Sequence, residues 1–492
     1  MVSPSWSHLE IQLDIEEKYA LLCYFILLDP MGNVRMLRQM GFCENRMLLT
    51  QDSRSTTPGG VPGIVMPGQW KAIICLFSEY VEQRLGEDCF RIHMEISGGQ
   101  KTDVIMGKTD DKKQYGEIIP PNDVVGEIDW NHPPYDFRKV YNSQKRWYKG
   151  DFHTHTQLSD GKETVAGAMK KAEYMGLDYY VPTEHNVMHT GWIDCPVMIL
   201  PGIEVTTSKG HFNIFGMDKM PEKLLEILRY AGGEQVQEYI HYTMEEVEKN
   251  GWLFSLNHPF LHIWKWLDYD LELSRVHFME IINDPTYGYA QEANNKTIRF
   301  LDYLWNRGYV IYGIGGSDSH NLINEYYEGA TEPSIAGDPG TYIMMDGLSP
   351  EHLLEAMKKG HIYVSRYITL GLRIEWNGRE YLPGDELPDG SGKQEKIVYE
   401  VTICSCVEQP VLLSIRNGKK ETIPLTEQEP GNWKACISFA WENAAWEWMR
   451  IEVRRQDDTF LAYTNPIYHG KRTSMQRTYK EALEGWKEEN CD

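Results

Sequence analysis

One stretch decides how the middle of this chain folds: residues 149–161, which read Lys149-Gly150-Asp151-Phe152-His153-Thr154-His155-Thr156-Gln157-Leu158-Ser159-Asp160-Gly161. The pattern predicts a strand over Trp147–His153, followed by a loop that carries Asp160. Side chains two residues apart on a strand point to the same side, so His153 and His155 can converge on one metal ion from the strand end. The alternative is two ordinary imidazoles at a strand terminus, and the rest of the chain has to decide between them.

Strands and helices alternate around this stretch, from about residue 146 to residue 368. Helical spacing over Glu163–Met175, Val236–Lys249 and Ala290–Trp305 separates short apolar runs typical of strands. About seven such units over about 220 residues predict a distorted, closed or nearly closed (β/α)7 barrel rather than an open sheet. The expected strands include Asp178–Pro182, Met198–Val205, His211–Phe215, Trp252–Asn257, Val276–Ile282 and Tyr309–Gly315.

Four further clusters of imidazole and carboxylate stand where these predicted strands end. Active sites of β/α barrels are built at that end of the strands. Burying many titratable groups without partners is costly, whereas divalent cations stabilise them. The shared location therefore favours a metal centre over packing. The clusters are Thr183-Glu184-His185-Asn186, Gly202-Ile203-Glu204 with Gly210-His211-Phe212-Asn213, Asn257-His258-Pro259, and Gly316-Ser317-Asp318-Ser319-His320.

The two flanks of the chain carry strand patterns. Residues 1–145 predict an N-terminal domain resembling a β-sandwich, with short strands that include Trp70–Phe77 and Cys89–Ile96. Residues 369–470 predict a second β domain, because Asn377-Gly378 and Asn417-Gly418 are strong hairpin signals. Residues 471–492 form a charged tail. The expected architecture is multidomain α/β plus β, with the barrel over residues 146–368.

Composition narrows the class of protein. Among 492 residues, 72 acidic side chains outnumber 49 basic ones, for a formal charge of −23. This balance argues against sequence-independent binding to nucleic acid or to an anionic membrane. The 9 cysteines are dispersed without a C-x-x-C pair, and neither a signal peptide nor an apolar run long enough to span a membrane is seen. We expect a cytoplasmic protein that binds a small molecule; its oligomeric state stays open.

Residues 150–161 (GDFHTHTQLSDG) and 183–186 (TEHN), together with the other clusters, resemble the polymerase-and-histidinol-phosphatase (PHP) superfamily of metallohydrolases. The similarity is greatest to the branch that includes carbamate hydrolases, and it covers about residues 146–368. It implies a barrel that holds two or three divalent ions. The first ion would be bound by His153, His155, Glu204 and Asp318; Glu204 would bridge to a second ion held by His211 and His258; and Asp160, His185 and His320 would hold a third.

The resemblance has one visible departure and leaves the metal open. Glu184 stands where the family usually has aspartate, and the extra methylene would alter the orientation of His185. Imidazole and carboxylate ligands suit Zn, Mn or Fe. His153, His155, Glu204, Asp318 and His320 would be the residues most directly involved in catalysis.

Side chains near these motifs could contact substrate. Lys162, Arg366 and His189 are candidates, and the alternative for each is a residue that is solvated or supports its neighbours. Aromatic residues flank His258 and could form either an apolar pocket wall or ordinary core: Trp252, Trp264, Trp266 and Tyr269.

The predicted function is that of a metal-dependent hydrolase that uses activated water, acting as a phosphoesterase on a small molecule. No G-x-S-x-G or P-loop element supports a serine triad or a phosphate-binding loop. A carbamate, ester or amide hydrolase is the close alternative. The acidic net charge disfavours a nuclease. A non-catalytic protein that binds carbohydrate or a partner is a further alternative, and the complete set of nine candidate ligands argues against it.

Overall fold

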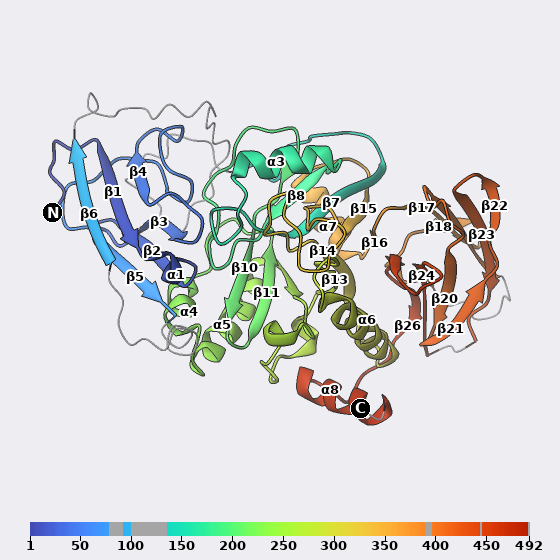
Figure 1. Ribbon diagram of the computed structural model, residues 1–492. Coiled ribbons are helices and arrows are strands. Elements are labelled where there is room, and N and C mark those ends of the chain that lie inside the picture. The colour runs from blue at the N-terminus through green and yellow to red at the C-terminus, as the bar shows by residue number, and fades with distance from the viewer. Residues whose placement is uncertain (78–91, 100–134, 389–395, 443–444, 491–492) are drawn as a thin grey trace.

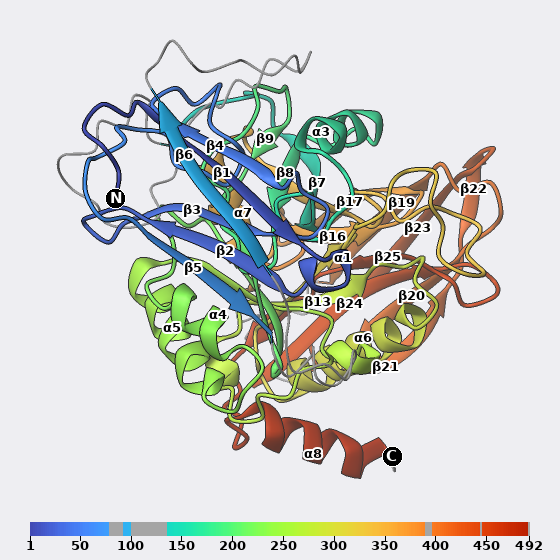
Figure 2. The same ribbon diagram turned by 60° about the vertical axis from the view of Figure 1, so that its left-hand side comes forward.

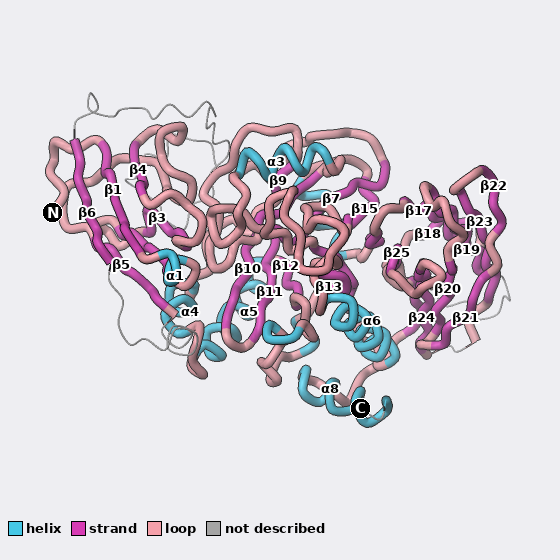
Figure 3. The backbone as a smooth tube through the Cα atoms, in the orientation of Figure 1, coloured by secondary structure: helices cyan, strands magenta, loops and turns pink. Residues whose placement is uncertain are grey.

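The computed structural model describes residues 1–77, 92–99, 135–388, 396–442 and 445–490. Figure 1 shows three β-rich parts in a row, with the N-terminal strands at one end and the C-terminal strands at the other. The same parts are seen from another side in Figure 2, and Figure 3 separates strands, helices and loops by colour. None of the described helices is long and apolar enough to cross a membrane.

The described residues of the N-terminal part form two small antiparallel sheets. One has the order β4-β1-β6, from β4 (Arg46–Thr50), β1 (His8–Ile15) and β6 (Ile92–Gly99). The other has the order β3-β2-β5, from β3 (Val34–Gln39), β2 (Cys23–Leu28) and β5 (Lys71–Leu76), with the short helix α1 (Glu17–Ala20) before it. Apolar side chains of both sheets share one core. The expected strand Cys89–Ile96 appears from Ile92 onward, and its first residues lie outside the described part.

The central elements follow the predicted alternation closely. The strand β7 spans Arg146–Thr154, and the helices α3 (Val165–Tyr174), α5 (Val236–Asn250) and α6 (Ala290–Asn306) match the expected ranges within two residues at each end. The remaining central elements are β8 (Tyr179–Pro182), β9 (Met198–Ile199), β10 (Gly202–Thr207), β11 (Gly210–Phe215), α4 (Leu224–Tyr230), β12 (Leu253–Leu256), β13 (Phe278–Asn283), β14 (Tyr312–Gly316), β15 (Gly340–Met345), α7 (Pro350–Lys358) and β16 (Ile362–Ser365).

The described central strands do not form the one closed ladder that a (β/α)7 barrel predicts. One sheet has the order β10-β11-β12-β13-β14, and β7, β8 and β9 belong to another. Single bridges join the two at Thr154–Ser319 and His185–Glu204. The β10–β11 connection explains part of the difference, because two residues can only join antiparallel strands, whereas a barrel crossover needs a dozen or more.

The described residues between 369 and 470 form strands and loops, and their hairpins agree with the sequence. One sheet has the order β18-β17-β19-β23-β22. Asn377 and Asn417 have φ of 52° and 48°, and the glycine after each is also positive, as a type I′ turn requires. The strands are β17 (Thr369–Trp376), β18 (Arg379–Tyr381), β19 (Ile397–Cys404), β20 (Val411–Arg416), β21 (Lys419–Ile423), β22 (Thr426–Glu429), β23 (Asn432–Phe439), β24 (Trp446–Arg454), β25 (Phe460–Thr464) and β26 (Ile467–Gly470).

The C-terminal strands also extend the central sheet. The order β21-β20-β24-β25-β16-β15-β7-β8-β9 is continuous, and β25 pairs with β16. The tail ends in helix α8 (Tyr479–Asn490), where Trp486 packs edge-on against Phe300 of α6. The strand β7, which leads into the two first histidines, therefore lies inside a broad sheet rather than at an edge.

Candidate metal centre

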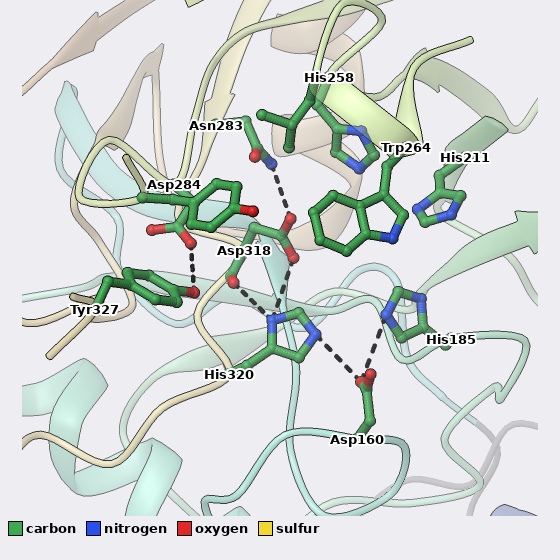
Figure 4. A pocket seen from close by; sticks show the side chains of 12 residues that line it. Asp160, His185, His211, His258, Trp264, Asn283, Asp284, Asp318, His320 and Tyr327 are labelled. Atoms are coloured by element: carbon green, nitrogen blue, oxygen red, sulfur yellow. Dashed lines mark hydrogen bonds and ion pairs between the residues drawn. The ribbon is translucent and has the colours of Figure 1, made fainter. Parts of the chain in front are cut away.

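The nine predicted ligands meet at one end of the central strands. They arrive from β7, β10 and β11 and from the loops that follow β7, β8, β12 and β14. Most of them are seen around one cavity in Figure 4. Within the described residues, four groups place their ligand atoms within 4.8 Å of one another: His155, Asp160, His185 and His320; His153, Glu204 and His258; His153, His155 and Asp318; and His185, Glu204 and His211.

The backbone turns sharply where the strands deliver these residues. His258 and Asp318 have φ of 27° and 49°, conformations that residues other than glycine seldom adopt. Beside them, Gly316 lets β14 approach β7, because a Cβ at this position would lie 2.3 Å from His153 Cβ and 2.4 Å from Glu280 Oε1. Such strain persists only where the surroundings fix it, and it is common at functional sites.

Glu204 lies at the middle of the cluster. Its Oε1 is 3.3 Å from His153 Nε2, 3.2 Å from His211 Nδ1 and 3.4 Å from His258 Nε2. Its Oε2 is 3.5 Å from His155 Nε2. One carboxylate thus faces imidazoles from both central sheets.

Two aspartates complete the cluster. Asp318 Oδ1 lies 3.3 Å from His153 Nε2 and 3.0 Å from His155 Nε2. Asp160 Oδ1 lies 3.4 Å from His185 Nε2 and 3.2 Å from His320 Nε2. Asp160 lies in the loop after β7 and Asp318 follows β14, which are the chain positions that the sequence predicted for them.

These close approaches are not satisfied hydrogen bonds, which tests whether the residues suit a metal ion. Within the described residues, buried polar atoms without a hydrogen-bond partner include His153 Nε2, both ring nitrogens of His155, Asp160 Oδ1, Glu204 Oε2 and Asp318 Oδ1. Ligand atoms held about 2.0–2.2 Å from one cation lie about 3–3.5 Å from each other. The observed spacing and the orphaned atoms therefore fit a site for divalent cations.

The charges of the cluster depend on one another. Burial opposes ionisation of Glu204, yet His153, His185 and His211 lower its pKa well below the usual value. Burial lowers the pKa of His155 to about 3, and the neighbouring His320 and His185 act in the same direction. His155 is therefore a neutral imidazole at pH 7, the form that binds metal.

Glu280 and Asn257 lie behind the ligands and fix the orientation of the ligand side chains. The sequence did not predict this supporting role for either residue. Glu280 on β13 lies with Oε1 3.0 Å from His153 Nδ1, and its Oε2 accepts hydrogen bonds from the amide nitrogen of His258 and from Asn283. Asn257 donates to Glu204 Oε1 at 3.0 Å. A carboxylate on the far ring nitrogen orients a ligating histidine. The sequence did carry a signal, since Glu280 is an acidic residue between the apolar residues Met279 and Ile281 of a buried strand.

Glu184, which stands where the resembled family usually has aspartate, holds the loop that carries Asp160. It accepts hydrogen bonds from the amide and hydroxyl of Thr156 and from the Ser159 hydroxyl. Burial raises its pKa to about 7. The longer side chain thus anchors residues 155–160, a different role from the expected effect on His185.

A cavity of about 240 Å³ opens beside the ligands (Figure 4). Leu261, Trp264, Tyr287 and Tyr327 give it an apolar wall. The Tyr327 hydroxyl donates to Asp284 at 2.7 Å, and burial raises the pKa of Asp284 to about 7. No lysine or arginine is among the described side chains that line it.

The three predicted substrate contacts do not line this cavity. Lys162 pairs with Glu325 at 2.9 Å, and Arg366 makes two hydrogen bonds of 2.7 Å to Asp338. His189 is buried and packs against Trp192. Of the aromatic residues around His258, Trp264 lines the cavity, Trp252 and Trp266 belong to the core, and Tyr269 is exposed.

No family model and no curated protein matches the chain. Among solved structures, a two-domain protein from Bacteroides vulgatus, named for a predicted PHP-like metal-dependent phosphoesterase, is 15% identical; the match covers 72% of this chain and 99% of that one, with a TM-score of 0.33. A target of the Northeast Structural Genomics Consortium is 11% identical over 22% of this chain and 88% of that one, with a TM-score of 0.13.

Proposed function

We propose that the chain is a metal-dependent hydrolase of the PHP type that cleaves a phosphoester bond in a small molecule. One observation carries the proposal: nine imidazole and carboxylate side chains from separate strands converge, with orphaned buried donor atoms, beside an open cavity. In this proposal the two central sheets are the halves of a distorted (β/α)7 barrel, and residues 146–368 form the catalytic domain of a cytoplasmic protein.

In the proposed function, the nine ligand residues would hold up to three ions. Divalent ions such as Zn, Mn or Fe would supply an activated water and neutralise charge on the substrate oxygen. His153, His155, Glu204 and Asp318 would hold the first ion, with Glu204 shared with a second at His211 and His258. Asp160, His185 and His320 would hold a third. Glu280 and Asn257 keep the His153 ring and the Glu204 carboxylate in place.

A second candidate is hydrolysis of a carbamate, ester or amide bond. The aromatic wall and the absence of lysine and arginine from the described lining favour a substrate with less negative charge than a phosphate monoester. The two candidates share the metal centre and differ in the bond attacked.

Metal analysis and turnover together test the proposal. The purified chain, dialysed against chelator and then reloaded with Mn or Zn, should regain cation in elemental analysis. It should also regain cleavage of p-nitrophenyl phosphate or bis-p-nitrophenyl phosphate. Cleavage of 1-naphthyl N-methylcarbamate alone would select the second candidate. Full turnover in excess chelator, or no stoichiometric cation after reloading, would contradict both.

A further inference from the structure

A second cavity adjoins the same ligand cluster from the side of the N-terminal strands. It has a volume of about 200 Å³, and Leu21, Leu22, Tyr24, Gln39 and Phe77 form its N-terminal wall. Its other wall is partly shared with the first cavity, because both are lined by Asp160, His185, His211 and Trp264; Thr206, Thr207, Ser208 and Ala231 line the second cavity alone. The two cavities therefore meet at the ligands, with Trp264 on the border of each.

Specific contacts hold the N-terminal wall against the cluster. The buried Tyr24 donates its hydroxyl hydrogen to the backbone oxygen of His185 at 3.2 Å, and its ring packs against Phe77. Gly41 lies so close to the Asp160 loop that a Cβ would stand 3.0 Å from the Ser159 carbonyl oxygen. The N-terminal segment is thus seated on the backbone that presents two ligands.

The N-terminal wall of the second cavity is largely apolar, because Leu21, Leu22 and Phe77 belong to it. Leu21 and Trp264 are 40% and 37% exposed, so both present apolar surface that substrate can cover. Gln39 supplies a polar atom, Oε1, that is buried and has no hydrogen-bond partner. No lysine or arginine is among the described side chains of either lining.

We infer that the second cavity is a substrate subsite, built jointly by the N-terminal segment and the ligand cluster, for an uncharged apolar or aromatic group. The inference rests on the proposed function and narrows it. A phosphate held between the two cavities can place one organic group in each of them. A phosphoester with two organic groups is a diester. A monoester carries one organic group and a second negative charge, so it would leave one cavity empty without gaining a cation from the lining.

Filling the second cavity tests this. Leu21→Trp places a large ring at an exposed position of its wall, and Met31→Trp, at a 59% exposed residue of the same N-terminal part, is the matched control. Loss of a buried aromatic contact changes binding by about tenfold or more. The ratio of kcat/KM for bis-p-nitrophenyl phosphate to that for p-nitrophenyl phosphate should fall about tenfold in Leu21→Trp and stay unchanged in Met31→Trp.

A measurement without turnover separates the subsite from the metal chemistry. Neutral 2-naphthol should bind the metal-free chain in calorimetry, about tenfold more weakly to Leu21→Trp, and equally well to Met31→Trp. If this pattern appears and no phosphoester is cleaved by the metal-loaded chain, the subsite stands and the bond assignment fails. If 2-naphthol binds both variants alike, or if the substrate ratio is the same in both, the subsite is overturned even when metal and phosphoesterase activity are present.

Discussion

Replacing Glu204 with glutamine removes one charge from the middle of the ligand cluster and leaves the side-chain volume nearly unchanged. Because Glu204 belongs to two of the four ligand groups, we expect Glu204→Gln to weaken cation binding more than loss of a supporting residue, which typically costs 10–100-fold. We therefore expect Glu204→Gln to lower the affinity for cation about 100-fold or more.

The magnitude translates into thermal stability. Cation at about 100 times its Kd stabilises the folded chain by about 2.7 kcal/mol, whereas the same concentration at a 100-fold higher Kd contributes about 0.4 kcal/mol. For a domain the size of residues 146–368, each kcal/mol shifts Tm by about 2–4 °C. The Tm of the wild type should therefore rise by about 5–10 °C when cation is added, and that of Glu204→Gln by about 1–2 °C. The metal-free Tm falls as well, because the anion of Glu204 is stabilised by its imidazoles, so the shift on loading is the quantity to compare.

Scanning calorimetry with and without Mn or Zn, paired with elemental analysis, measures this. Glu246→Gln is the control, since Glu246 is a buried glutamate of α5 that accepts a hydrogen bond from the Glu222 amide and lies outside the ligand groups. It should keep the wild-type shift. A Glu204→Gln protein with wild-type metal content and the full shift would refute the shared-ligand reasoning.

Three further substitutions probe the site and the fold. Asp318→Asn should lower turnover about 100-fold or more with an unchanged circular dichroism spectrum; wild-type initial rates would contradict its role. Arg450→Met removes the cation that pairs with buried Asp302 and one of the two cations, the other being Arg454, that contact Glu452. It should cost about 3–5 kcal/mol of unfolding free energy in denaturant titration, whereas a loss below about 1 kcal/mol would contradict this. A hydrogen bond to the buried Asp268 raises the pKa of His241 above 6.5. The stabilisation that the charged imidazole provides is therefore complete below pH 6.5 and is lost as the pH rises through the raised pKa. His241→Gln should cost more unfolding free energy at pH 5.5 than at pH 9, and an equal cost at both would exclude this linkage.

The sequence predicted the elements of the centre better than their connection into sheets. The strand before His153 and the helix Ala290–Asn306 match because strong local periodicity specifies them. The antiparallel β10–β11 pair was not anticipated, because strand patterns give the strand and not its partner. The short Ser208-Lys209 connection was the available signal for a hairpin.

The ligands were predictable and most of their surroundings were not. His, Asp and Glu at strand ends are residue types with few other reasons to cluster, so their convergence follows from topology once the strands are placed. Lys162 and Arg366 show the limit of the same reasoning: they stand near the motifs in sequence, but Glu325 and Asp338 pair with them elsewhere. Proximity along the chain indicates neither the direction of a side chain nor its partner.

The N-terminal segment has a physical reason to be part of the site, although no motif indicates one. Its contacts with the cluster run through backbone atoms, the His185 oxygen for Tyr24 and the Gln157 oxygen for Arg38, and a backbone acceptor leaves no signature in residue type. Because these contacts fall on the segments that deliver His185 and Asp160, displacing the N-terminal strands would both open the second cavity and release the backbone behind two ligands. Binding of an apolar group and retention of cation are therefore expected to respond together when this contact is weakened, for example in Tyr24→Phe.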